Sequence, residues 1–444
     1  MPFFTGLQEK TLRWHWLVGT SAGIFLQGCG YLLAFGSGIL SARALGSSAF
    51  GHFTYVLSIV GVASTLALLG LPEVTTRFMA VFHASQQWGL GRGLIRFTQT
   101  VCILSAILLM VVLGLIGLVL KNSELRLTLW VASPILIMAV IVNLRQQTLQ
   151  GLHHPIAAQI PEQIIKYVVF LTVGGTLWIA GSAYVRQPAG LMSLWVLSTL
   201  VSLMVGIVLL RRFLPFSMNT AKPEYARTYW IKTAMPMWIA NGVGVIYGTV
   251  DTIILGFFRP FAAVGLYQVA LRAAGTITIV VASSNWVLAP WFSRLFSLHD
   301  RARLQALVTR VTRGVFLLTL CFFAVLALGG REILQLFFGV AYVRAFEPLL
   351  ILGSSRIVTI AIGPVIALQL MTGGQKIVAW VTALGLLMNT LGCVLIIPKL
   401  GIRGAALSTG LSMIVTQEIL AVYLKRRIGL KPGVFGHYGL VRKS

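Results

Sequence analysis

Long apolar runs separated by short polar segments make up most of the chain. A helix needs roughly 20 apolar residues to cross the ~30 Å hydrocarbon core of a bilayer. Runs of about this length occur at residues 17–40, 50–71, 98–120, 127–144, 164–180, 191–210, 234–258, 265–291, 314–330, 349–371, 377–397 and 404–424. The pattern therefore predicts an all-α polytopic membrane protein with about twelve transmembrane helices.

The longest polar segment, residues 211–233, lies near the middle of the chain. It contains Pro215 and Pro223 and separates six apolar runs from six. We therefore expect a cytoplasmic N-terminus (1–16), an N-lobe with spans 1–6 (17–210), a cytoplasmic linker (211–233), a C-lobe with spans 7–12 (234–424) and a cytoplasmic C-terminal tail (425–444).

A short motif recurs after the first and the seventh span. It reads Leu45-Gly46 with Phe50-Gly51 in the first half, and Leu255-Gly256 with Val264-Gly265 in the second. Either the halves are related, or any short hairpin favours such residues because glycine permits tight turns and close helix approach. If the halves are repeats of six spans each, they share one orientation, and we expect two six-helix lobes around a central cavity.

Composition and charge agree with a membrane protein. The residues are 57% apolar and 10% charged, and the formal net charge is +25. This charge does not indicate a nucleic-acid partner, because no segment between the runs is long enough for a basic soluble domain. With the N-terminus inside, most of the 35 Lys and Arg residues fall in inner segments, as the positive-inside rule requires. Both termini are therefore expected in the cytoplasm.

Small and polar residues line one face of the first span, including Gln27, and one face of the seventh, with Asn241, Gly244, Gly248 and Asp251. Such stripes let helices pack closely in lipid, or they line a water-accessible cavity. Because a carboxylate in hydrocarbon costs a few kcal/mol or more, the presence of Asp251 favours the interpretation that this face of the seventh span lines a water-accessible cavity.

Ionisable residues inside the apolar runs are few, and they mark candidate functional positions: Glu162, Lys166, Asp251, Arg272, Arg356 and Glu418. Asp251 and Arg272 are expected at similar depth and could form an ion pair. Such a pair would be structural, or it would serve proton coupling or the binding of an anionic headgroup.

Arg356 is expected roughly 13 Å inside its span, too deep to reach the surface easily, so it joins Arg272 as a candidate anion ligand. Glu162 and Lys166 are an i, i+4 pair near the inner surface, where they either neutralise each other or serve as secondary site candidates. Glu418, close to Lys425, favours a structural role.

The sequence contains no hydrolase, metalloprotease or phosphate-binding-loop motif. We therefore expect no enzyme, no metal and no cofactor. Without a phosphate-binding loop, transport would draw on a proton or sodium gradient, on the gradient of the substrate, or on a separate ATPase.

Several motifs occur in order along the chain: Ala42-Arg43-Ala44-Leu45-Gly46 with Phe50-Gly51, Gly70-Leu71 with Arg77, Asp251-Thr252-Ile253-Ile254-Leu255-Gly256 with Val264-Gly265-Leu266-Tyr267 and Ala270-Leu271-Arg272, Phe338-Gly339 with Tyr342, and Asn389 followed by Ile397-Pro398-Lys399-Leu400-Gly401-Ile402-Arg403-Gly404-Ala405-Ala406. Together they resemble the polysaccharide transporter family of Wzx-type O-antigen flippases, within the multidrug/oligosaccharidyl-lipid/polysaccharide exporter superfamily.

This resemblance implies a flippase of the bacterial inner membrane. Its cargo would be undecaprenyl-pyrophosphate-linked oligosaccharide, moved to the outer leaflet by alternating access for O-antigen, capsule or exopolysaccharide synthesis. Arg272 and Arg356 suit a pyrophosphate, because guanidinium groups offer forked donors. A polymerase and other glycan-assembly proteins would be its partners, beside membrane lipid. An ion-coupled exporter of cationic compounds and a membrane-bound glycan polymerase or ligase stay open as alternatives.

Overall fold

The structure is a computed structural model that describes the backbone of residues 6–436 and most of their side chains. All regular elements in this range are helices. The N-terminal half contains α1 (Gly6–Ala67), α2 (Leu71–Ala84), α3 (Trp88–Val119), α4 (Ser123–Ala132), α5 (Ile135–Gly151), α6 (Pro155–Ile160), η1 (Pro161–Ile165), α7 (Lys166–Ile179), η2 (Ala183–Arg186) and α8 (Pro188–Phe213), followed by the short α9 (Phe216–Thr220).

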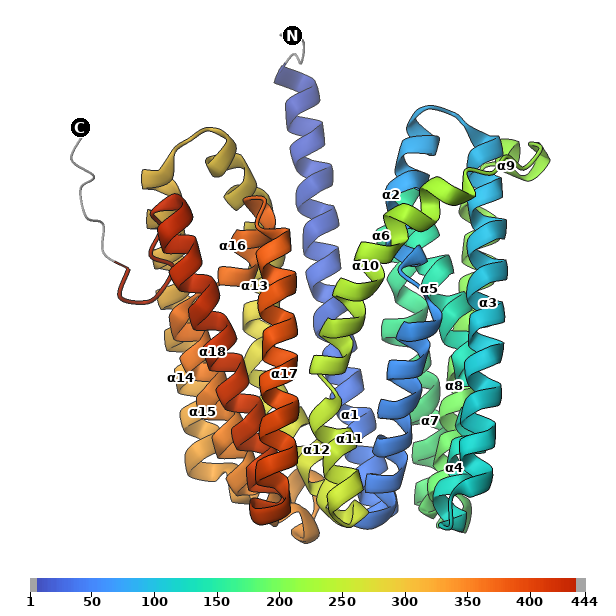
Figure 1. Ribbon diagram of the computed structural model, residues 1–444, viewed down its shortest axis with the longest axis vertical. Coiled ribbons are helices and arrows are strands. Elements are labelled where there is room, and N and C mark those ends of the chain that lie inside the picture. Colours follow the sequence, from blue (N-terminus) through green and yellow to red (C-terminus); the bar gives the residue numbers. More distant parts are fainter. Residues whose placement is uncertain (1–5, 437–444) are drawn as a thin grey trace.

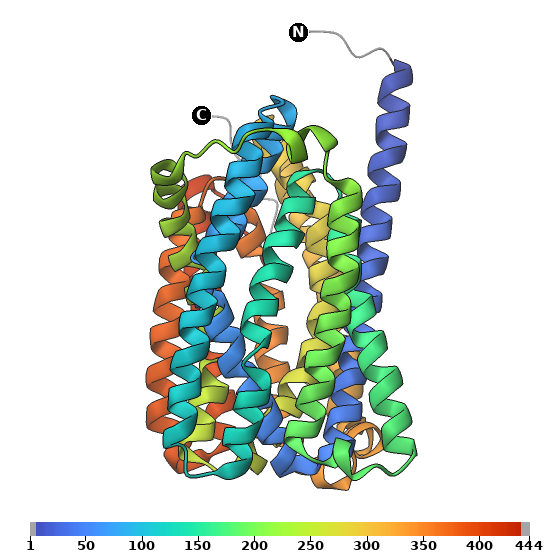
Figure 2. The same ribbon diagram turned by 90° about the vertical axis from the view of Figure 1, so that its right-hand side faces the viewer.

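The C-terminal half contains α10 (Arg227–Tyr247), α11 (Val250–Phe258), α12 (Phe261–Gly275), η3 (Thr276–Thr278), α13 (Ile279–Ser297), α14 (Arg301–Phe338), η4 (Val340–Ala345), α15 (Phe346–Ile362), α16 (Val365–Met371), α17 (Gln375–Leu400) and α18 (Ile402–Ile428). The long helices run along one common direction in two bundles, and both termini lie at the same end (Figures 1 and 2).

Ten helices of the described chain are long and apolar enough to cross a membrane, or eleven when α10 and α11, bent by 47°, count as one broken span. The longest, α1, has 62 residues, roughly 90 Å of helix and far more than one crossing needs. Its backbone turns at Gly46, with φ 71° and ψ 174°, and the chain then runs back (Figure 1). The count therefore agrees roughly with the expected twelve.

Glycines with positive φ lie at two breaks between consecutive helices. Gly70 (φ 68°) precedes Pro72 at the start of α2, and Gly363 (φ 103°) precedes Pro364 between α15 and α16. Proline lacks the N–H that continues a helix, and glycine adopts positive φ without strain. The apolar run 349–371 is therefore a broken helix, whereas the run 50–71 ends at the break before α2.

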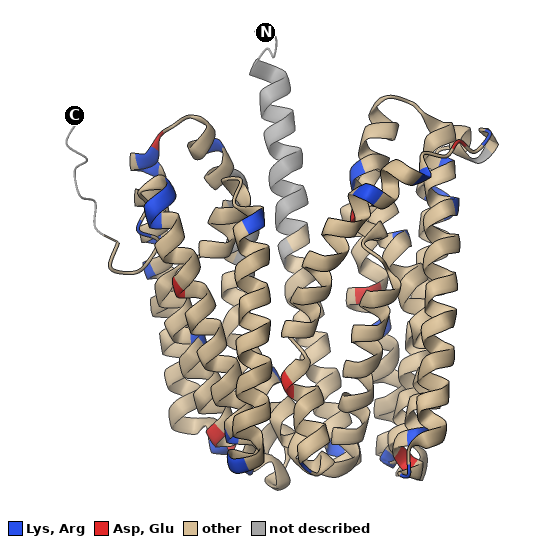
Figure 3. Ribbon diagram, in the orientation of Figure 1, with Lys and Arg blue, Asp and Glu red and all other residues tan. Residues whose placement is uncertain are grey.

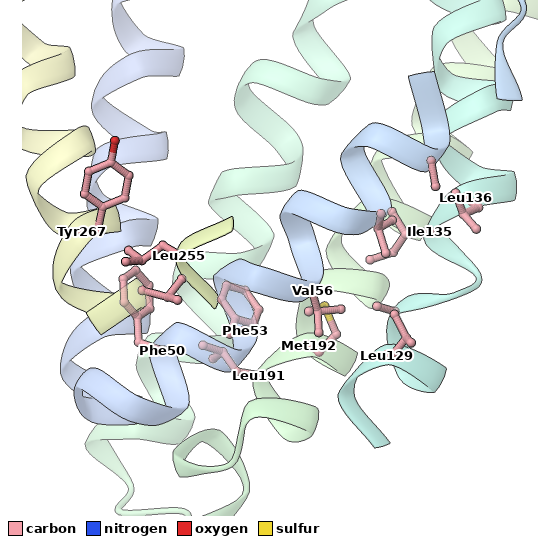
Figure 4. Packing of buried hydrophobic residues seen from close by; sticks show 14 of the residues in the cluster. Phe50, Phe53, Val56, Leu129, Ile135, Leu136, Leu191, Met192, Leu255 and Tyr267 are labelled. Atoms are coloured by element: carbon pink, nitrogen blue, oxygen red, sulfur yellow. The ribbon is translucent and has the colours of Figure 1, made fainter. Parts of the chain in front are cut away.

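A large cluster of buried side chains joins the two halves. Phe50 and Phe53 of α1 lie beside Leu255 of α11 and Tyr267 of α12 (Figure 4). Lipid tails are as apolar as these side chains, so shape complementarity rather than a hydrophobic driving force favours this packing. The Lys and Arg residues lie mostly toward the two ends of the bundles, with few inside (Figure 3).

Candidate functional site

The two halves cross at the end of the bundles away from the termini. A Cβ atom at Gly51 of α1 would overlap the carbonyl oxygen of Phe261, and one at Gly265 of α12 would overlap that of Ser47. Backbone therefore touches backbone, which only glycine allows. We call this contact the Gly51–Gly265 crossing.

The crossing explains the repeated motif only in part. Gly51 and Gly265 play the same role from opposite sides. Gly46 and Gly256 do not, because Gly46 makes the turn in α1 whereas Gly256 packs against the ring of Tyr55. The motif thus marks a contact between the halves rather than two similar hairpins.

Two polar contacts reinforce the crossing. The Arg43 Nε atom donates to the Phe337 carbonyl at 2.8 Å, and its Nη2 atom donates to that of Leu336, so Arg43 caps the end of α14. The buried Tyr342 hydroxyl donates to the Ala42 carbonyl at 2.9 Å. Each bond joins α1 to the C-terminal half and must break if the halves separate at this end.

Arg272 lies between α12 and α1. Its Nη1 atom donates to the Ala34 carbonyl at 3.4 Å, and its guanidinium lies 5.9 Å from the centre of the Phe50 ring. Gly38 makes room for it, because a Cβ there would overlap the guanidinium. The face of small residues on the first span therefore serves close packing at Gly38. Gln27, which precedes it on α1, is half-buried.

Asp251 is 1% exposed and binds hydroxyl and amide groups rather than a base. Its carboxylate accepts hydrogen bonds from the Tyr267 hydroxyl at 2.6 Å, the Thr409 hydroxyl at 2.9 Å and the Thr252 amide at 2.7 Å. Asn389, which is fully buried, extends this group, since Thr409 also lies 3.4 Å from its Oδ1 atom.

The suggested ion pair between Asp251 and Arg272 is wrong for this structure. The four ion pairs of the described residues include neither side chain. Helix geometry gives the reason: Tyr267, which meets Asp251, and Arg272 are five residues apart on α12 and point about 140° away from each other. Arg272 therefore faces α1.

Arg356 of α15 is close enough to Asp251 for their charges to interact. The buried Arg356 Nε atom has no hydrogen-bond partner in the described chain. The two candidate anion ligands thus occupy different surroundings, and each has guanidinium donors to spare.

The Glu162–Lys166 pair forms as the i, i+4 spacing predicted. The Lys166 Nζ atom lies 3.1 Å from the Glu162 carboxylate, which also accepts a 2.6 Å hydrogen bond from the Ser202 hydroxyl. The ammonium lies 5.0 Å from the centre of the Tyr167 ring and 5.4 Å from that of Trp195. Glu162 belongs to the π-helical turn η1, a conformation frequent at functional sites.

Arg145 of α5 directly follows the apolar run 127–144, so the hydropathy pattern does not single it out. It is 2% exposed, and its Nη2 atom donates to the Ala158 carbonyl at 3.3 Å. The Nε and Nη1 atoms have no partner in the described chain. Gly206 of α8 leaves the space that the Arg145 guanidinium fills.

Asn241 of α10, which the sequence analysis names as a candidate, is exposed.

The fold defines a class of protein: a multi-pass α-helical membrane protein. It is similar to a structure of a multidrug resistance MATE family transporter of the MOP superfamily, with a TM-score of 0.71, 12% identity and coverage of 90% of this chain and 94% of that chain. It is also similar to the lipid II flippase MurJ, with a TM-score of 0.69, 13% identity and coverage of 90% and 87%.

The family follows from the sequence. The profile of the family described as polysaccharide biosynthesis protein matches residues 17–296, so the chain belongs to that family. A probable low-salt glycan biosynthesis flippase, Agl15 of Haloferax volcanii, is 26% identical over 190 residues, which are 42% of this chain. The match spans 40% of the length of that relative. The resemblance to the polysaccharide transporter family is thereby confirmed.

Proposed function

We propose that this protein moves undecaprenyl-pyrophosphate-linked oligosaccharide from the inner to the outer leaflet of the bacterial inner membrane. Its family and the glycan flippase relative support a lipid-linked glycan as cargo. The observation that carries the proposal is the position of Arg272, a guanidinium between the two halves of the chain with no acidic partner in the described residues.

The cargo has two parts with different needs. The polyprenyl tail stays in lipid, whereas moving a sugar pyrophosphate through hydrocarbon unassisted would cost many kcal/mol. The protein would shield the headgroup between its halves, with Arg272 and Arg356 binding the pyrophosphate through forked donors. The Gly51–Gly265 crossing would close the outer side until the halves rock apart, in an alternating-access cycle.

The orientation belongs to the same proposal. Both termini would lie in the cytoplasm, which leaves the crossing at the outer surface. A surface polysaccharide such as O-antigen, capsule or exopolysaccharide would be the final product, and a polymerase and other glycan-assembly proteins would act on the flipped cargo. The protein itself would perform no chemistry and would need no cofactor.

Asp251 is our candidate for coupling to a proton or sodium gradient. It is a carboxylate inside a broken span, held by the hydroxyls of Tyr267 and Thr409. A carboxylate without an ionic partner in the membrane is costly unless it binds a proton or a cation during the cycle. Arg356 would sense that event through its electrostatic interaction with Asp251.

The test is a transport assay in a strain without a second flippase. We expect Arg272→Ala and Arg356→Ala to lose surface glycan and accumulate lipid-linked intermediate on the inner leaflet, and Lys at either position to restore part of the transport. Arg186→Ala is the matched control, because Arg186 is exposed in η2. Normal transport by both Ala variants, at equal amounts in the membrane, would refute the anion site.

An ion-coupled exporter of small cationic compounds is the second candidate, because the fold is also similar to that of a multidrug resistance transporter. Such a protein needs acidic groups for its cargo, whereas Arg272 and Arg356 are basic and Asp251 is already hydrogen-bonded. Greater drug susceptibility of the deletion strain, with normal surface glycan, would favour this candidate.

A further inference from the structure

A pocket outside the proposed cargo path lies between α15, α18 and the segment that follows α18. Its volume is about 400 Å³, within the range of small-molecule sites. Glu418, Lys425 and Lys431 line it together with apolar residues such as Val358 and Val422. The C-terminal end of α18 and the segment that follows it lie toward the end of the C-terminal bundle at which the termini lie (Figure 1).

The segment 430–436 forms one wall of this pocket and is firmly attached. The Gln305 side chain donates to the Lys431 carbonyl at 2.7 Å and accepts from the Lys431 amide at 2.8 Å. The Arg313 Nε atom donates to the Val434 carbonyl at 2.9 Å, and the Val434 amide donates to the Ala361 carbonyl at 2.9 Å. Lys431 is therefore held in a fixed place beside the pocket.

The charges of the pocket are not neutralised within the described chain. Neither lysine nor Glu418 belongs to any of its four ion pairs. Lys425 comes from the last turn of α18, while Glu418 lies seven residues earlier, roughly 10 Å deeper along the helix. The mouth of the pocket therefore carries two ammonium groups, and the carboxylate lies well below them.

The apolar wall opens toward the lipid. Val358 of α15 and Val422 of α18 are large apolar residues that are 42% and 41% exposed. In a membrane-spanning bundle such side chains face hydrocarbon. The pocket thus combines a cationic mouth at the membrane surface with an apolar wall, which is the chemistry of a phospholipid with a negatively charged headgroup.

We propose that this pocket binds an anionic phospholipid, with its phosphate between Lys425 and Lys431 and an acyl chain along Val358 and Val422. The bound lipid bridges the end of α18 and the segment 430–436. Phosphatidylglycerol fits the net single positive charge of the three side chains, whereas phosphatidylcholine, with its bulky cationic headgroup, does not.

The experiment is native mass spectrometry of the full chain, titrated with phosphatidylglycerol or phosphatidylcholine. We expect the wild type to prefer phosphatidylglycerol. Lys425→Gln and Lys431→Gln should each weaken its binding about fivefold, since a Lys near anionic lipid contributes about 1 kcal/mol, which is about a factor of five in affinity. The double variant should lose about 25-fold. Lys376→Gln is the matched control, because Lys376 is exposed at the start of α17 at the same end.

Two further variants test the geometry. Glu418→Gln should strengthen phosphatidylglycerol binding about twofold, because it removes a negative charge roughly 10 Å away. Gln305→Ala should weaken binding by freeing Lys431. Equal binding of phosphatidylglycerol by the double variant and by Lys376→Gln would overturn the proposal. So would equal affinity for phosphatidylcholine, or displacement of the lipid by inorganic phosphate, which would indicate a site for a free anion.

Discussion

Replacing Gly51 by Ala tests whether the Gly51–Gly265 crossing closes one end of the protein. The new methyl group would overlap the Phe261 carbonyl oxygen, so α1 and α12 must move apart. Inserting a methyl group into a tightly packed contact costs about 1–3 kcal/mol. Gly61→Ala is the control on the same helix, because nothing lies within 4 Å of a Cβ built there. It carries the same change in helix propensity, up to ~1 kcal/mol.

The difference between the two variants isolates the crossing. If open and closed forms exchange, a cost of about 1–3 kcal/mol to the closed form raises the open fraction about 5- to 150-fold. A cysteine at Ala42, which is fully buried beside Tyr342, reports the opening to a membrane-impermeant thiol reagent. Cys29 and Cys321, which are not buried, are first replaced by serine.

We expect Gly51→Ala to accelerate labelling of this cysteine at least fivefold over Gly61→Ala, and Gly265→Ala to act in the same way from the other side. Equal labelling rates in all three variants, at equal amounts of folded protein, would refute the reasoning. They would mean that the crossing does not limit access to this end.

Substitutions at three other positions test individual contacts. Tyr342→Phe removes the hydrogen bond to the Ala42 carbonyl, which contributes about 1 kcal/mol to the closed form. The labelling rate of the cysteine at position 42 should rise about fivefold, and an unchanged rate would mean that this hydrogen bond plays no part in closure. The buried Arg145 guanidinium has two nitrogens without a hydrogen-bond partner, and Arg145→Met replaces it by an apolar side chain. The melting temperature should therefore stay the same or rise, and a large fall would contradict this account. Asp251→Asn should abolish the dependence of transport on the ion gradient with little change in melting temperature, and unchanged gradient dependence in this variant would argue against coupling. Asp251→Ala removes the acceptor shared by the Tyr267 and Thr409 hydroxyls and should cost about 1–3 kcal/mol of stability.

The spacing of residues along the sequence predicted the features that depend on a single helix. The apolar runs gave the spans because length and hydropathy alone decide membrane crossing. The Glu162–Lys166 contact was predictable for the same reason, since residues four apart on a helix are neighbours whatever surrounds them. The break at Gly363 escaped the hydropathy pattern, which does not register a positive φ inside an apolar run.

Contacts between helices were predicted less well. Similar depth suggested that Asp251 meets Arg272, but the rotation of α12 brings Tyr267 to Asp251 instead. Thr409, 142 positions after Tyr267, completes the site, and no spacing rule connects residues so far apart. A buried polar residue in an apolar run, as Asn389 is, was the one available signal.

The most direct test of the proposed function is translocation by the purified protein in vesicles. Fluorescent undecaprenyl-pyrophosphate-linked oligosaccharide is placed in both leaflets, and a membrane-impermeant quencher is added outside. We predict that vesicles with the wild type lose nearly all fluorescence, because inner-leaflet cargo reaches the outer leaflet. Vesicles with Arg272→Ala should retain about the half that protein-free vesicles retain. The same half retained with the folded wild type would contradict the account.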